Sequence, residues 1–600
     1  MDKDLRMDFM TDKERKMVDD YLTKIDQNRG YMQELYARWE KEQEAYSGDQ
    51  ALIDNRPNSR VNIINANIEG QVSALVEQNL AVVCRGEGPS DQQFSDWARV
   101  LLDWTFRQNH IKRKLRKHEF RRELFGSAWF KLYFDPDAVK GYGLVKICTP
   151  SLNSIHIDMK VSDEEDVQDG EYIGEVMLKS KTWAKEEYGD FLAAQINLGG
   201  SDRRTIFSKE RTTDDDNAFW LIQLWTKTDG ILRMIEFSED GTLLFDSFKE
   251  FDEDKKKFKD TEDPKPFYRY NQYPYFFTNL YIEEGQLYGF GDGKLLRPLQ
   301  DMINDLYDQI RRAARPNRIF FDESSEVDLE DLDEDDGPVP CLDPNTTIRV
   351  VEVGKVNPAL WQLVKNIHEE VQRVTRFSEL MMGQGGKAQT ATESAIQQQQ
   401  GSQATDHKKL MLQETLVDVA KYALDIMMEK YTEGKAFRID EDKDEFMWVD
   451  ARQLNKVPVL KPATEGYIKE YKKSNPEATS DMYQFMQLED GSTKSVDLDI
   501  EINIGAGLPK NKAFLYQMLQ ALAGMQVEGR SVISWDEFRQ FAKDFLGLPL
   551  EDDAQMMQQP MGQPMPMSQP MGPMQNANVQ GLSPQGAPMT SALPPGGGMV

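Results

Sequence analysis

The stretch that decides the fold is residues 273–318, YPYFFTNLYIEEGQLYGFGDGKLLRPLQDMINDLYDQIRRAARPNR. Its glycine-rich turn, YGFGDG, is followed by apolar residues three or four positions apart, namely Leu299, Ile303, Leu306 and Ile310. This spacing puts their side chains on one face of a helix, which we expect from about residue 293 to just before Pro316. At about 1.5 Å per residue, such a helix is roughly 34 Å long.

A second long helix is predicted after a short interruption. Residues 317–354 contain an acidic run and the β-type segment TIRVVEV, and Pro358 then stands where a first-turn proline is favoured. The helical pattern that follows ends at Met382, and its apolar residues include Leu363, Ile367, Val371 and Val374. Two long helices on either side of a small excursion predict a helical hairpin with a module inserted at its tip.

The chain before this hairpin predicts an α+β body. Helical periodicity covers residues 13–46, 61–80 and 96–125. Short β-type runs then alternate with Asp, Gly and Pro turn signals over residues 126–290. We therefore expect an α+β protein that is mainly α.

The chain after the hairpin begins with a loop, GQGGKAQTA at residues 383–391, that is flexible by composition. A long helix to about Tyr431 follows, then strands up to residue 505 and closing helices at 510–523 and 534–546. From Ala554 to Val600 there is no charged residue, while nine Met and nine Pro are present. Such a composition cannot build a packed core, so a disordered tail is predicted.

The composition excludes several classes of protein. The 72 Lys and Arg residues face 102 Asp and Glu residues, which gives a formal net charge of −30. So negative a chain is a poor general binder of nucleic acid. No stretch is apolar enough to span a bilayer, and the N-terminus has no apolar signal core. The three cysteines, Cys84, Cys148 and Cys341, lack C-x-x-C spacing, which argues against a disulfide framework and a zinc ribbon and fits a reducing cytoplasm.

Local signatures of catalysis do not occur in the sequence. YGFGDGK departs from the phosphate-binding GxxxxGK[ST] pattern, because Tyr288 replaces its first glycine and Leu295 its Ser or Thr. The five histidines lack the spacing of an HExxH zinc site. The acidic run after residue 330 has Leu342 where a calcium loop needs Glu. We therefore expect no enzymatic activity, no metal and no cofactor.

One basic cluster stands out in this acidic chain. It consists of Lys112, Arg113, Lys114, Arg116, Lys117, Arg121 and Arg122. A solvated helix face that pairs with local acids is the favoured interpretation. A patch that faces phosphate groups stays open as an alternative.

The 273–318 stretch resembles the start of the first stem helix in portal proteins of tailed bacterial viruses, most like those of short-tailed phages. In that family a Tyr-Gly-x-Gly approach precedes a helix with Leu-Gln-x-x-Ile/Leu-Asn-x-Leu, matched here by Leu299, Gln300, Ile303, Asn304 and Leu306. Further similar stretches follow in the family's order at 101–136, 182–190, 385–395 and 502–522. Together they span about Arg56 to Pro549. The last 50 residues depart from the helical C-terminal barrel of some short-tailed phage portals.

This resemblance implies a portal fold with named parts. They are the wing at 1–290, the first stem helix at 291–316, the clip at 317–354, the second stem helix at 355–382, the tunnel loop at 383–391, the long wing helix at 392–432, further wing strands at 433–505, the crown helices at 506–550 and a disordered Met-, Pro- and Gln-rich tail at 551–600. The hairpin predicted above would be the stem, and the excursion at its tip the clip.

The resemblance also implies a function. Portal proteins form a ring, here expected as a dodecamer, at one capsid vertex, and double-stranded DNA passes through it during packaging and ejection. The expected partners are the terminase packaging motor, the tail adaptor and the major capsid protein, without a membrane. The protein would be assembled in the host cytoplasm and reside in the virion. Energy would come from the motor ATPase, since the chain has no nucleotide site of its own.

The resemblance assigns residues to two surfaces of the ring. The tunnel loop would present Gln384, Lys387 and Gln389 to the DNA, with Lys387 as a sparse ring of positive charge. The clip would offer the motor and adaptor the carboxylates of Asp322, Glu323, Asp331, Asp333, Glu334, Asp335 and Asp336. An acidic channel wall repels phosphate, so that DNA slides without sticking.

Two alternatives belong to other classes. A non-channel scaffold or tail component would form oligomers without an axial opening. A metal-dependent nuclease or peptidase within the α+β body would show turnover and an ordered metal, which no spacing of residues indicates.

Overall fold

The computed structural model describes most of the chain up to residue 504 and two short strands beyond it. The described residues are 9–48, 61–76, 80–88, 91–197, 218–314, 317–320, 349–352, 357–376, 391–438, 446–462, 486–504, 526–527 and 530–531. The chain divides into two compact units, Met1–Leu508 and Pro509–Val600. In the second unit β21 (Gln526–Val527) pairs antiparallel with β22 (Arg530–Ser531). The predicted closing helices and C-terminal tail lie outside the described residues.

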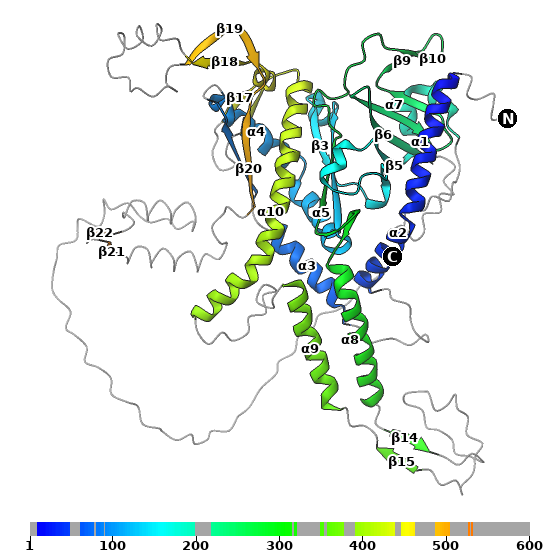
Figure 1. The fold of residues 1–600 in the computed structure, drawn as a ribbon, viewed down its shortest axis with the longest axis vertical. Helices are drawn as coiled ribbons and strands as arrows, with labels where there is room; N and C mark the ends of the chain where they lie inside the picture. Colours follow the sequence, from blue (N-terminus) through cyan, green and yellow to red (C-terminus); the bar gives the residue numbers. More distant parts are fainter. Residues whose placement is uncertain are drawn as a thin grey trace, which may run out of the picture. The chain divides into compact units, whose positions relative to one another are not determined.

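The described part of the first unit mixes helices and sheets, which confirms the α+β expectation (Figure 1). Its helices are α1 (Asp12–Tyr31), α2 (Gln33–Ser47), α3 (Ile63–Val76), α4 (Gln92–Gln108), α5 (Ile111–Phe125), α6 (Ala138–Gly141), α7 (Lys181–Gln195), α8 (Asp292–Ala314), α9 (Pro358–Thr375) and α10 (Ala391–Lys430). Short 3-10 turns occur at Leu152–Ser154, Glu165–Asp169 and Ala451–Asn455. No described helix is both long and apolar enough to cross a membrane.

A five-stranded antiparallel sheet forms one layer of this unit. Its strands, in spatial order, are β4 (Ile155–Ile157), β5 (Tyr172–Ser180), β6 (Ala218–Thr228), β7 (Ile231–Ser238) and β8 (Leu243–Asp246). β6 and β7 join through Asp229 and Gly230, both at positive φ, which is the backbone that a two-residue hairpin with the strands' twist requires. Leu224 faces the core shared with α1 and α7, while Trp225 faces the main core, as the two-residue period of a strand dictates.

A three-stranded sheet lies in the main core. β2 (Ser127–Asp135) is central and pairs with β11 (Tyr275–Asn279) and β3 (Leu144–Cys148). Gly126 links α5 to β2 at φ +96°, and the backbone of Phe290 would lie 2.2 Å from a Cβ added there. Only glycine fits this close approach, which brings β13 (Gln286–Phe290) against the end of α5.

Two-stranded antiparallel pairs complete the unit. They are β9 (Lys249–Asp252) with β10 (Lys257–Asp260), β12 (Tyr281–Glu283) with β13 (Gln286–Phe290), β14 (Asn317–Phe320) with β15 (Arg349–Glu352), β16 (Lys435–Arg438) with β17 (Phe446–Val449), β18 (Val457–Pro462) with β19 (Met486–Lys494), and β1 (Leu80–Gly86) with β20 (Leu498–Ile504). The last pair joins residues far apart in sequence, Leu80 opposite Ile504. The chain before the predicted hairpin and the chain after it therefore fold as one body.

Several predicted helices are shorter than expected. The helix predicted at 13–46 divides at Met32, where α1 turns towards β4 and α2 towards α8. The helix predicted at 96–125 divides at His110, whose backbone is left-handed, while Asn109 Nδ2 donates to the Val145 carbonyl at 2.7 Å. The helix predicted at 61–80 ends at Val76, and β1 begins at Leu80. In each case a tertiary contact or a second element overrides a continuous helical pattern.

The two long helices of the predicted hairpin pack side by side as α8 and α9 (Figure 1). β14 follows α8 and pairs with β15, which precedes α9, so the strands bring the two ends of the excursion together. Pro358 is in the first turn of α9, and the Asn357 side chain accepts the Ala359 amide at 3.0 Å as the N-cap. α9 ends at Thr375 because Arg376 adopts left-handed backbone angles, so its predicted end at Met382 was wrong.

Candidate functional site

The apolar seam between α8 and α9 uses most of the predicted residues. Ile303, Leu306 and Ile310 of α8 are buried, as are Ile367 and Val371 of α9, whereas Leu299 and Val374 are half-buried. Leu363 was predicted on this seam but is 47% exposed. The burial follows Val364, Ile367 and Val371 at helical spacing, which places Leu363 on a neighbouring face of α9.

The same helix pair carries exposed apolar side chains outside the seam. Met302 of α8 is 53% exposed, and Trp361 of α9 is 51% exposed. The Trp361 ring meets Tyr307 edge to face at 6.3 Å between centroids. The seam residues are thus buried between α8 and α9, while Met302 and Trp361 stay exposed within the part of the chain that the structure describes.

The matched motif residue Gln300 joins α8 to the start of α3. Its Oε1 accepts the Ile63 amide at 2.8 Å, and its Nε2 donates to the Val61 carbonyl and to Asn304 Oδ1 at 2.8 and 3.0 Å. The first amides of a helix have no partner within the helix, so Gln300 acts as a cap supplied by another element. The motif found through resemblance thus has a physical role in fixing α8 on the body.

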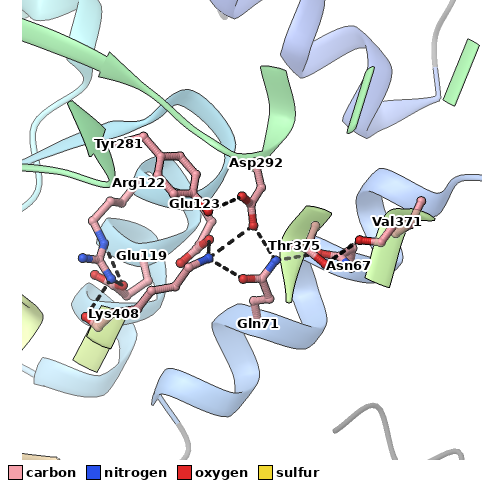
Figure 2. Close-up of polar contacts among 10 residues, drawn as sticks. All are labelled: Asn67, Gln71, Glu119, Arg122, Glu123, Tyr281, Asp292, Val371, Thr375 and Lys408. Atoms are coloured by element: carbon pink, nitrogen blue, oxygen red, sulfur yellow. Dashed lines mark hydrogen bonds and ion pairs between the residues drawn. The ribbon is translucent and has the colours of Figure 1, made fainter. Parts of the chain in front are cut away.

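A buried polar network occupies the root of the α8–α9 pair, where α3, α5, α8, α9 and α10 meet (Figure 2). At its centre the Lys408 ammonium of α10 contacts Glu123 Oε2 of α5 at 2.5 Å and Asp292 Oδ2 of α8 at 3.2 Å, and it donates to Gln71 Oε1 of α3. Tyr281 OH donates to the other oxygen of Asp292 at 3.0 Å. One lysine therefore binds side chains from three different helices.

The same network reaches the end of α9. Gln71 Nε2 donates to Asp292 Oδ2 at 2.7 Å and to Asn67 Oδ1 at 2.5 Å. Asn67 Nδ2 in turn donates to the Thr375 hydroxyl at 3.4 Å, and that hydroxyl donates to the Val371 carbonyl at 2.9 Å. The first turn of α8 and the last turn of α9 are thus linked through α3 to Lys408.

Burial sets the protonation of these groups. Burial raises the pKa of Glu123 to about 7, although the Lys408 ammonium lowers it, and the nearby Asp292 carboxylate adds to the rise. Burial disfavours the charged form of Lys408, but the carboxylates of Glu123 and Asp292 outweigh it and raise its pKa. Glu123 Oε1 has no hydrogen-bond partner within the described part of the chain.

A second buried ion pair extends the network along α5. Arg122 donates through Nε to Glu119 Oε2 at 3.0 Å and through Nη2 to the Lys408 carbonyl at 3.1 Å. His118 Nδ1 lies 2.8 Å from the other Glu119 oxygen, and its ring stacks on Phe130 at 4.0 Å. Burial raises the pKa of Glu119, but the Arg122 guanidinium and His118 outweigh it, so the pKa is lowered overall.

The basic cluster of α5 is therefore only partly the solvated face predicted from the sequence. Arg122 is fully buried in the network just described. Arg121 donates to the Thr149 and Pro150 carbonyls, and Lys114 to that of Ile147. Arg116 is exposed and pairs with Glu69 at 2.8 Å, as the solvated interpretation expects. Arg121 and Lys114 thus hold α5 against the end of β3.

The sequence analysis did not find the buried network. Lys408 lies in the polar stretch ATDHKK and Asp292 in the glycine-rich YGFGDG, where both types of residue are expected at a surface. Glu123 offered the one usable signal, because it stands between basic residues and the apolar pair Leu124 and Phe125 at the end of a helix. A charged side chain is buried there only when partners come from elsewhere in the chain.

The other predicted site residues cannot be placed. The tunnel-loop residues Gln384, Lys387 and Gln389 lie outside the described residues, and so does Cys341. The clip carboxylates Asp322, Glu323, Asp331, Asp333, Glu334, Asp335 and Asp336 also lie outside them. Cys84 and Cys148 are free thiols, and burial raises the pKa of Cys84 to about 12.

Two further observations complete the description. A cavity of about 520 Å³ lies between α10, β11 and the turn at 164–168, with Glu164, Glu414 and Asp418 among its lining residues. The described residues contain no cluster of three or more His, Cys, Asp or Glu side chains that could hold a metal ion.

No family model and no curated protein matches this chain.

Proposed function

We propose that this chain is a portal protein, which forms a ring at a single capsid vertex and provides the channel for double-stranded DNA during packaging and ejection. The observation that carries the proposal is the order α8, β14, β15, α9, in which two long packed helices are joined by a paired strand insertion. This order matches the stem and clip that the sequence motif implies.

The exposed apolar side chains of the α8–α9 pair support a ring. Met302, Trp361 and Leu363 expose large apolar surface on α8 and α9. In a ring, each helix pair lies between two copies of itself, so side chains on one flank of a pair would meet the opposite flank of the neighbouring pair. A contact between two different flanks repeats around an axis, and it closes into a ring when the rotation from copy to copy completes a full turn.

The charge of the chain supports passage of DNA rather than its retention. A net charge of −30 in each copy disfavours tight binding of phosphate along a channel wall. The chain would act without catalysis of its own, and the terminase motor would supply the energy. The tail adaptor and the major capsid protein would be its other partners in the virion.

Mass measurement of the purified full chain tests the proposal. Single-particle mass photometry should find a species of about twelve times the 69.1 kDa chain, at a protein concentration below about 1 µM. A neighbouring whole-number multiple would correct the subunit number and keep the ring. A single species of chain mass, or a continuous ladder of masses without a limit, would contradict it.

A further inference from the structure

Lys408 is the residue at which α10 is held by the rest of the body. It is 6% exposed, and its ammonium contacts Gln71, Glu123 and Asp292, which belong to α3, α5 and α8. Its main-chain carbonyl accepts a hydrogen bond from Arg122 of α5 at 3.1 Å. Side chain and backbone of one residue are thus both fixed, which positions this turn of α10 along its axis as well as around it.

The ends of both long helices depend on the same lysine. Asp292 is the first residue of α8, and it binds Lys408 directly. Thr375 is the last residue of α9, and it is connected to Lys408 through Asn67 and Gln71 (Figure 2). The two helix ends that face the body therefore share one anchor on α10.

An arrangement of this kind specifies geometry more than it adds stability. The network buries the cations Lys408 and Arg122 with the carboxyl groups of Glu119, Glu123 and Asp292. Burial of charge is costly, and well-packed apolar residues of similar volume are often as stable or more stable. Apolar residues, however, do not make the directional contacts that hold α3, α5 and α8 at a fixed position against α10.

We propose that Lys408 is a clamp that makes α10, the start of α8 and the end of α9 move as one body. A displacement of α10 at this turn is then passed to both long helices. The coupling itself stands on the contacts described above. Only its use, the coupling of the segment before α10 to the stem of a DNA channel, rests on the proposed function.

Hydrogen exchange of the full chain, followed by mass spectrometry, tests the clamp. In Lys408→Met, which keeps the length of the side chain and removes its charge, amides of 292–303 and 367–375 should exchange at least about 10-fold faster. Exchange in the five-stranded sheet should stay within about 2-fold of the wild type. The control is Lys131→Met, because Lys131 is equally buried and pairs with Glu175 in the sheets. It should accelerate exchange around β2 and β5 and leave 367–375 unchanged.

A cycle of variants separates a clamp from a general contribution to stability. Asp292→Asn in the Lys408→Met background should recover part of the lost protection at 367–375, because it removes one of the two buried carboxyl groups that lose Lys408 as their partner. Glu123→Gln, which keeps its shape, should accelerate the same two segments by a smaller factor. It also decides the matter if Lys408→Met does not fold.

Two results would overturn the clamp. One is faster exchange confined to α10, and the other is an equal effect of Lys131→Met on residues 367–375. Neither result bears on subunit number, which the mass measurement decides separately. A failure of the clamp and a failure of the ring are therefore distinguishable.

Discussion

Glu123 makes the stability of the fold depend on pH. Burial raises its pKa to about 7 in the folded chain, above the value of about 4.5 for a free glutamate, so the folded state holds a proton that the unfolded state releases. The contribution of Glu123 to stability is therefore complete below about pH 4.5 and is lost as the pH rises through 7.

We expect Glu123→Gln to remove this contribution to the pH dependence. The free energy of unfolding, measured by urea denaturation between pH 5 and 8, should fall less steeply with pH in Glu123→Gln than in the wild type. Other carboxyl groups with raised pKa values, such as the half-buried Asp425, keep their own contribution in both proteins. Equal slopes would show that Glu123 does not titrate in this range.

Gln300 is the second residue whose replacement should be costly. Gln300→Ala leaves the buried Ile63 amide and the Val61 carbonyl without their partner, and it should lower the free energy of unfolding by about 1–3 kcal/mol. Gln362→Ala is the matched control, because Gln362 is exposed on α9 and bonds only Asn366 in its own helix at 3.0 Å. It should stay within about 0.5 kcal/mol of the wild type.

At the level of helices, the exposed apolar side chains of Met302 on α8 and Trp361 on α9 should serve assembly and not folding. Met302→Gln combined with Trp361→Gln should reduce the fraction of assembled protein, as measured by mass photometry, without lowering the chain's unfolding free energy by more than about 0.5 kcal/mol. Ile303→Ala, on the buried seam, should instead destabilise the chain by about 2–5 kcal/mol. Assembly unchanged in the double variant would place the subunit contact elsewhere.

The helices show what periodicity can and cannot predict. The span of α8 was close to its prediction, because its seam residues repeat without interruption along the helix. The end of α9 was not predicted, because the residue type of Arg376 does not indicate left-handed backbone angles. The break at His110 was also not predicted. It depends on hydrogen bonds between Asn109 and β3, which lies far from it in the sequence.

The candidate site was harder to predict than the fold. The exposed or buried position of an apolar residue follows from its helical face, and among the apolar residues predicted on the seam of α8 and α9 this failed for Leu363. The Lys408 network has no such periodic signal, because its members come from five elements that meet only in the folded chain. Charged residues at surface-like positions of the sequence cannot reveal that partners from other helices surround them.

At the scale of the whole molecule, the acidic charge should prevent tight binding of DNA. With a net charge of −30 per chain, the purified protein should bind a duplex of about 50 base pairs with a dissociation constant weaker than about 1 µM at about 150 mM salt. Fluorescence anisotropy with a labelled duplex measures this directly. Nanomolar affinity at that salt concentration would mean that a basic surface holds DNA, and the exposed cations of α5 would be the first to test.

In the proposed ring, copies of this chain surround an open axis with their α8–α9 pairs. Electron microscopy of the purified full chain, with class averages viewed end on, tests this arrangement. We expect closed rings with a central opening and with the helix pairs arranged around it. Solitary particles without an opening, or rings in which the α8–α9 pairs lie enclosed within each subunit away from the axis, would contradict it.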